Sequence, residues 1–84
     1  MLELLYFAWL KERMGVGGER LPLPDGVATV GDLAAWLQAR DDRGARAFAE
    51  PTVVRAAVNQ DFASPSTPVQ DGDEVAFFPP VTGG

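Results

Sequence analysis

The hydrophobic and polar positions near the start of the chain predict two strands joined by a short helical turn. Residues 2–10 are apolar on both alternating faces, which is typical of a central strand that is buried on two sides. We expect a single helical turn at residues 10–14. Residues 19–23 alternate and contain Pro22, which cannot donate to a ladder, so they predict an edge strand antiparallel to the first.

The main helix is predicted at residues 29–40. Thr29 is a good N-cap, and Asp32, three residues later, completes a capping-box pattern. The apolar positions that recur with helical spacing, and that we expect to pack on a sheet, are Val30, Leu33, Ala34 and Leu37, with Trp36 at the border of that face. The charged stretch 41–44 is interpreted as a solvated loop, and residues 45–49 as a second short helix.

Three extended segments follow the helical region. Residues 53–58 predict a strand on which Arg55 points to solvent, and residues 62–63 predict a short strand after a turn. Asp71-Gly72 is a turn signal, because glycine tolerates a positive φ and aspartate bonds its own backbone. Residues 74–78 are rich in strand formers and predict the last strand.

The order strand, strand, helix, strand, short strand, strand predicts an α+β fold. Because early and late strands flank one long helix, the simplest packing lays that helix across one face of a mixed sheet. The first and last strands are then central neighbours, which is the ubiquitin-like β-grasp arrangement. We expect residues 1–84 to form a single domain with an extended C-terminal tail at residues 79–84.

Composition narrows the possible functions. Twelve acidic against seven basic residues give a net charge of −5. We therefore expect neither nucleic acid nor a membrane as a partner, because both require a basic patch. The chain has no histidine and no cysteine, which removes imidazole bases, thiol nucleophiles and the usual zinc ligands. We expect a chain that is not an enzyme by itself, binds no metal or cofactor and, without a signal-peptide pattern, is cytoplasmic.

The candidate chemistry lies at the C-terminus. Pro79-Pro80 stops the last strand and holds the backbone extended. Gly83 and Gly84 have no Cβ, so a narrow channel can accept them with backbone alone. The carboxylate of Gly84 is therefore well suited to activation by another protein. The alternative at this stage is a frayed end that carries two glycines without a function.

Two phenylalanines near the tail are candidates for partner docking. If Val75 and Phe77 face the helix, the alternation of the last strand turns Phe78 to solvent. Phe62 lies next to a turn and is expected to be exposed as well. Two exposed aromatic rings beside the tail would form a docking patch. The alternative is that both rings pack under the loop at residues 63–69.

With this fold and tail, the chain resembles the small subunit of molybdopterin synthase, a family of ubiquitin-like sulfur carriers. The resemblance covers the whole chain. It is carried by Leu4-Leu5-Tyr6-Phe7-Ala8 with residues 10–13, by residues 29–33 and 57–60, and above all by the terminal block Asp71-Gly72-Asp73-Glu74-Val75-Ala76-Phe77-Phe78-Pro79-Pro80-Val81-Thr82-Gly83-Gly84.

The resemblance implies a mechanism in which partners supply the catalytic groups. An E1-like adenylating enzyme uses Mg-ATP to adenylate Gly84, and a sulfur donor displaces AMP to leave a thiocarboxylate. The small subunit then docks on the large synthase subunit in a heterotetramer, where sulfur passes to cyclic pyranopterin monophosphate to form molybdopterin. Phe62 and Phe78 match positions that contact partners. The residues implied to thread the partner's active site are Pro80, Val81, Thr82 and Gly83.

Three alternatives stay open. A sulfur carrier for thiazole synthesis would share the Gly-Gly end and the adenylation, although the run Phe-Phe-Pro-Pro-Val-Thr argues against it. A ubiquitin-like modifier would join Gly84 to lysines of other proteins. A plain binding module would carry an idle tail, and it predicts that deletion of Gly83-Gly84 changes nothing.

Overall fold

The computed structural model describes residues 1–80, which contain a mixed 5-stranded sheet in the order β2-β1-β5-β3-β4. The elements in chain order are β1 (Leu2–Tyr6), α1 (Trp9–Met14), β2 (Gly18–Leu21), α2 (Val30–Arg40), α3 (Asp42–Ala47), the 3-10 turn η1 (Pro51–Val53), β3 (Arg55–Val58), β4 (Asp61–Ala63) and β5 (Glu74–Phe78). The predicted α+β, ubiquitin-like arrangement is confirmed, since the first and last strands are parallel neighbours at the centre of the sheet.

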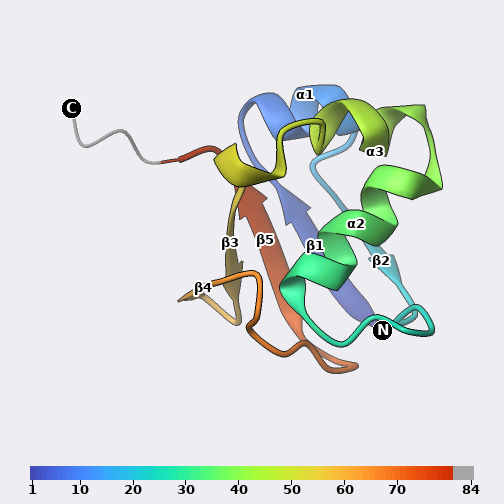
Figure 1. Cartoon of the computed structure of the whole chain (residues 1–84), viewed down its shortest axis with the longest axis vertical. Helices are drawn as coiled ribbons and strands as arrows, with labels where there is room; N and C mark the ends of the chain where they lie inside the picture. Colours follow the sequence, from blue (N-terminus) through green and yellow to red (C-terminus); the bar gives the residue numbers. More distant parts are fainter. Residues whose placement is uncertain (81–84) are drawn as a thin grey trace.

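Helix α2 lies across one face of this sheet (Figure 1). Its start is fixed by the predicted capping box. The backbone N–H of Asp32 donates to the Thr29 hydroxyl at 3.2 Å, and the Asp32 carboxylate accepts from the Thr29 N–H at 3.2 Å. A further N–H donor, from Ala28, helps to hold the pKa of the Asp32 carboxyl below its usual value.

The core lies between α2 and the sheet. Tyr6 of β1 stacks on Phe77 of β5, with ring centroids 6.4 Å apart, and Phe48 meets Phe77 edge-on at 5.0 Å. Leu33 and Leu37 of α2 are fully buried against them. The predicted helical face is therefore confirmed, and Trp36 lies at its border, half-buried against the core.

A polar cluster joins the end of α2 to the edge strand β2. The Tyr6 hydroxyl donates to Glu19 Oε2 at 2.7 Å, and Arg40 donates to both Glu19 carboxylate oxygens at 2.8 and 2.9 Å. Burial, together with the hydrogen bond to Glu19, raises the pKa of Tyr6 well above its usual range. The Arg40 guanidinium, aided by the Tyr6 hydroxyl, holds the pKa of Glu19 below its ordinary value.

The prediction that the first strand is long and buried on two sides was wrong. β1 ends at Tyr6, because Ala8 turns the chain with a φ of 54° and a ψ of −132°, and α1 begins at Trp9. The face of β1 that carries Leu2, Leu4 and Tyr6 is buried, while Leu5 is half-buried. Within residues 1–80, α2 covers only one side of the sheet, so the second apolar face stays open.

The predicted loop at 41–44 was also wrong, because α3 begins at Asp42 and a single residue separates it from α2. The Asp41 side chain caps α3 by accepting from the Gly44 N–H at 2.8 Å. Gly44 is required by packing rather than by a turn, since a Cβ there would lie 1.8 Å from the Leu37 carbonyl oxygen. The second short helix therefore spans Asp42–Ala47 instead of 45–49.

The remaining boundaries shift by a few residues. η1 takes the first residue of the strand predicted at 53–58, so β3 is Arg55–Val58, with Arg55 exposed as expected. β2 is an edge strand, as predicted, and pairs antiparallel with β1. None of the helices found in residues 1–80 is long and apolar enough to cross a membrane.

The backbone at Ala8 generates a stability prediction. A φ of 54° with a ψ of −132° is unfavourable for any residue with a Cβ. We expect Ala8→Gly to raise the free energy of unfolding by about 1 kcal/mol, because the relief of strain exceeds the added entropy of the unfolded chain. Urea unfolding measures the change.

The matched control is the same substitution inside a helix. Ala35→Gly, at an exposed position of α2, is expected to lower the free energy of unfolding by about 1 kcal/mol. Equal losses in the two variants would show that Ala8 is not strained.

The polar cluster around Glu19 predicts a pH dependence. Because the folded pKa of Glu19 is depressed, its stabilisation is fully present above its unfolded pKa of about 4.3 and is lost as the pH falls through the folded pKa. We expect Glu19→Gln to be less stable than the wild type at pH 7, and the difference to shrink in acid. Glu12→Gln removes the same charge from exposed α1 and is the control. If the difference in the free energy of unfolding between Glu19→Gln and the wild type were the same at every pH, the prediction would be wrong.

Candidate functional site

The face of the sheet opposite α2 is apolar and uncovered within residues 1–80. Strand register places Leu5, Ala76, Ala57 and Phe62 in one row across β1, β5, β3 and β4. The Phe7 N–H donates to the Phe77 carbonyl at 3.1 Å, which continues the ladder past Tyr6 and gives Phe7 the next outward position. We call this surface the outer face and define it by Leu5, Phe7, Ala57, Phe62, Ala76 and Phe78.

The two predicted docking residues meet on the outer face. Phe62 is 83% exposed, which confirms the expectation for that side chain and excludes burial under the following loop. Its ring lies 6.0 Å from that of Phe78, with an interplanar angle of 59°. Phe78 was predicted to be exposed but is half-buried, because it lies against Phe62 and beside Arg55 on the neighbouring strand.

The outer face is continuous with the root of the tail. β5 ends at Phe78, so Pro79 stops the strand as predicted, and Pro79 and Pro80 follow directly. In Figure 1 the head of the β5 arrow points toward η1, which is where the chain leaves the sheet. The predicted tail residues Val81, Thr82, Gly83 and Gly84 lie outside the described residues. β5 therefore carries Phe78, a candidate docking residue, and the chain continues from this strand toward the candidate reactive end.

Charged side chains border the apolar centre of the outer face. Glu3 and Arg20 are partners across β1 and β2, and Glu74 starts β5. At the tail end, exposed Arg55 is the cross-strand partner of Phe78 and donates to the Thr52 carbonyl at 2.8 Å. A polar rim around an apolar centre is the usual anatomy of a protein interface.

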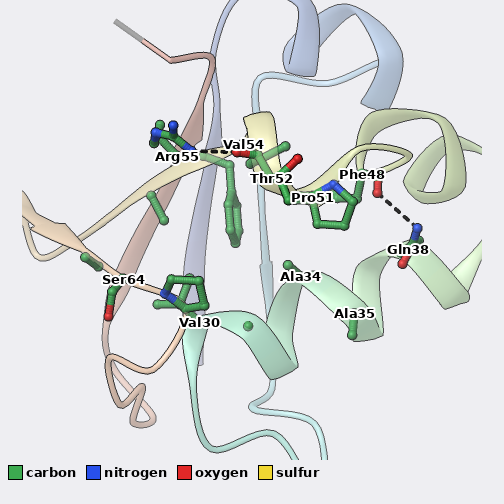
Figure 2. A pocket seen from close by; sticks show the side chains of 15 residues that line it. Val30, Ala34, Ala35, Gln38, Phe48, Pro51, Thr52, Val54, Arg55 and Ser64 are labelled. Carbon is green, nitrogen blue, oxygen red and sulfur yellow. Dashed lines mark hydrogen bonds between the residues drawn. The ribbon is translucent and has the colours of Figure 1, made fainter.

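A second depression lies on the α2 side of the sheet, between α2, η1 and the loop after β4 (Figure 2). It is a cleft of about 300 Å³ with a mostly apolar lining that includes Val30, Ala34, Phe48, Pro51, Val54 and Pro65. At its rim, the Gln38 side chain donates to the Phe48 carbonyl at 3.0 Å. Among the described residues that line this cleft, Arg55 is the one with a charged side chain.

Metal-binding groups do not gather in the described part of the chain. No three acidic side chains among residues 1–80 lie close enough together to hold an ion. The outer face presents aromatic rings beside the strand that leads to the chain end, an arrangement that suits protein docking.

Sequence reasoning missed Leu5 and Phe7 as members of the outer face. Both were assigned to a second buried side of the first strand, whereas Phe7 is 49% exposed. The signal that could have found them was the alternation that placed Phe78 outward. Since the first and last strands pair in parallel, the residues that alternate with Leu4 and Tyr6 must face the same way as Ala76 and Phe78.

Comparison with known proteins assigns the family. The molybdopterin synthase sulfur carrier subunit of Escherichia coli (strain K12) is 43% identical over 84 residues, which is 100% of both chains. That of Haemophilus influenzae is 39% identical, again over 84 residues and 100% of both chains. The model of the ThiS family matches residues 4–84. The chain belongs to the ThiS family.

Several solved structures share the fold. A protein described as molybdopterin converting factor subunit 1 of Pyrococcus furiosus has a TM-score of 0.76 at 32% identity, covering 95% of this chain and 97% of that one. Small archaeal modifier protein 1 of Haloferax volcanii has a TM-score of 0.73 at 29% identity, with the same coverage. The complex of subunits 1 and 2 of molybdopterin-converting factor from Helicobacter pylori 26695 contributes a match with a TM-score of 0.63 at 26% identity, covering 99% and 97%.

These relationships confirm the resemblance to the small subunit of molybdopterin synthase, and with it the sulfur-carrier role. They also confirm the ubiquitin-like β-grasp fold. The roles of individual residues, from Phe62 and Phe78 to Gly84, stay predictions at this point.

Proposed function

We propose that this ThiS-family chain carries sulfur as a thiocarboxylate on Gly84 and delivers it inside the large subunit of molybdopterin synthase. The observation that carries the proposal is the continuity of the outer face with the tail. Phe78 ends β5 within an apolar surface, and Pro79-Pro80 begins the exit at the next residue. A partner that binds the outer face therefore receives the tail at a fixed point of its own surface.

Activation of the terminus belongs to an adenylating partner. The Gly84 carboxylate attacks the α-phosphate of Mg-ATP, and pyrophosphate leaves. Sulfide from a sulfur donor then attacks the acyl carbon, AMP leaves as the carbon–sulfur bond forms, and the product is the thiocarboxylate. Adenylation turns a poor electrophile into an attackable one. The chain contains no cysteine, so it has no thiol that could capture the activated acyl group.

Delivery requires docking on the large subunit. The solved complex from Helicobacter pylori, which joins subunits 1 and 2 of molybdopterin-converting factor, supports a two-subunit assembly for this chain as well. In that assembly, Phe62, Phe78 and the newly found Phe7 contact the large subunit, and Pro80, Val81, Thr82 and Gly83 thread its active site. The thiocarboxylate sulfur displaces an oxygen substituent from a carbon of cyclic pyranopterin monophosphate, which leaves a thioester to Gly84. Water cleaves that thioester and restores the Gly84 carboxylate. A second small subunit that carries a thiocarboxylate supplies the other sulfur of the dithiolene of molybdopterin.

A ubiquitin-like protein modifier is the second candidate, because the fold is also that of small archaeal modifier protein 1. The same activated Gly84 would then form an isopeptide bond with a lysine of a target protein. That outcome would shift whole target proteins by 9.0 kDa. The similarity to the sulfur carrier subunits of molybdopterin synthase from Escherichia coli and Haemophilus influenzae favours the synthase over both this role and a role in thiazole synthesis.

The docking role predicts a loss of affinity when either ring is removed. We expect Phe62→Ala and Phe78→Ala each to weaken binding to the large synthase subunit about 10-fold or more, because aromatic side chains at the centre of an interface carry much of its binding energy. Since Phe62 is exposed, its substitution should change the free energy of unfolding by less than about 0.5 kcal/mol. Calorimetry with purified subunits measures the affinity.

Val54→Ala is the control for this experiment. It shortens an apolar side chain that lines the cleft on the opposite side of the sheet, and we expect it to leave the affinity unchanged. An unaltered dissociation constant for Phe78→Ala would remove Phe78 from the docking surface.

The narrow-channel argument predicts a different effect at the terminus. We expect Gly84→Ala to slow adenylation strongly, because its methyl group crowds the carboxylate that must meet the α-phosphate, and to change docking on the large subunit by less than about 2-fold. Pyrophosphate release measures the first quantity and calorimetry the second. Equal losses in the two assays would contradict the argument. If deletion of Gly83-Gly84 changed neither adenylation nor docking, the chain would be a binding module with an idle tail.

A further inference from the structure

The turn between β3 and β4 has a positive φ at both of its residues. Its two residues, Asn59 and Gln60, join the paired residues Val58 and Asp61, and both have positive φ values, of 49° and 72°. Two-residue hairpin turns with this backbone favour asparagine first and glycine second. Asn59 is therefore the residue that this turn favours at its first position, and its side-chain amide can form hydrogen bonds outside the turn.

That side chain ties the turn to the start of β5. Asn59 Nδ2 donates to Asp73 Oδ1 at 3.0 Å, and Asn59 Oδ1 accepts from the Glu74 N–H at 3.0 Å. The Asn59 N–H also donates to the Glu74 carbonyl at 2.8 Å. Asp73 is itself held, because its second carboxylate oxygen accepts from the Gln70 N–H at 2.8 Å and its carbonyl accepts from the Glu3 N–H at 3.0 Å.

Phe62 depends on this attachment for its place. It lies on β4, which has three residues, forms the edge of the sheet and pairs with β3 alone. Because Phe62 is 83% exposed, burial does not fix its ring, and its aromatic neighbour is Phe78 on the next strand but one. The position of Phe62 over the outer face is therefore set by the β3–β4 hairpin. Asn59 attaches the turn of this hairpin to the central strand β5.

We propose that Asn59 is a positioning residue for partner docking: by hydrogen bonding to Asp73 and Glu74, it holds the β3–β4 hairpin so that Phe62 lies beside Phe78 on the outer face. The inference rests on the proposed docking role of Phe62 and Phe78. It adds a residue that lies in a turn beside the start of β5, at the other end of that strand from Pro79, and that has no part in the sulfur chemistry.

The first arm of the test removes the side chain and keeps the turn. Glycine accepts a positive φ, so Asn59→Gly preserves the backbone while it deletes both side-chain hydrogen bonds. We expect a 5- to 10-fold weaker affinity for the large synthase subunit, on the order of one lost interface contact. The measurement is made at a temperature where every variant is fully folded, so that a merely structural role would leave the affinity unchanged.

The second arm asks whether Asn59 acts through Phe62. In a Phe62→Ala background the ring is absent, so Asn59→Gly should cause no further loss of affinity. A double-mutant cycle of these two substitutions measures the coupling directly. Independent, additive losses would overturn the inference, because they would mean that Asn59 affects docking by some other route.

The third arm is a rescue that exchanges the two partners. Asn59→Asp alone places a carboxylate against Asp73 and should weaken docking. Adding Asp73→Asn restores a donor and an acceptor at each point, including the acceptors for the Gln70 and Glu74 N–H groups, at the original net charge. We expect the double variant to recover affinity to within about 2-fold of the wild type, and failure to recover would count against the proposal.

The outcomes separate this inference from the proposed function. If Phe62→Ala weakens docking but Asn59→Gly does not, the positioning role is wrong while the docking face stands. If Phe62→Ala leaves the affinity unchanged, the docking face itself is wrong and the positioning role falls with it.

Discussion

The parallel pairing of β1 with β5 is the constraint on which the rest of the structure depends. It aligns Leu4 with Val75 and Tyr6 with Phe77, so the side chains that meet α2 come from both ends of the chain. The same register turns Leu5 and Ala76 to the opposite side, because alternate residues of a strand face opposite ways. A shift by one residue would exchange the buried and exposed sets together. Core and outer face are therefore two consequences of one pairing.

The uncovered outer face has a physical cost, which the proposed docking role explains. An apolar surface of this kind is a liability for an isolated domain, since it promotes association with other proteins. The charged rim around it and the net charge of −5 limit nonspecific association. In the proposed function, the chain binds an adenylating enzyme and then the large synthase subunit, and one surface placed where the tail leaves the fold would serve both partners. β5 provides this arrangement, because it ends with Phe78 and continues into Pro79.

Much of the fold was predictable because local signals and tertiary packing agree. The capping box at Thr29 and Asp32 marked the start of α2, and the strand order followed from the alternation of extended and helical segments. The errors arose where a long-range contact decides the structure. Gly44 resembles a helix breaker in sequence, yet it lies in α3, at a position where the Leu37 carbonyl leaves no room for a Cβ. Phe7 resembles a core residue, and only the one-sided cover of the sheet exposes it.

The most direct test of the sulfur-carrier account is the mass of the C-terminal residue. The protein is incubated with the adenylating enzyme, Mg-ATP and sulfide, and the products are fragmented in the mass spectrometer. The account predicts a gain of about 16 Da on Gly84, and fragmentation separates it from methionine oxidation, which adds the same mass at Met1 or Met14. The account would be contradicted if Gly84 stayed unmodified under conditions in which the Escherichia coli relative gains a C-terminal thiocarboxylate.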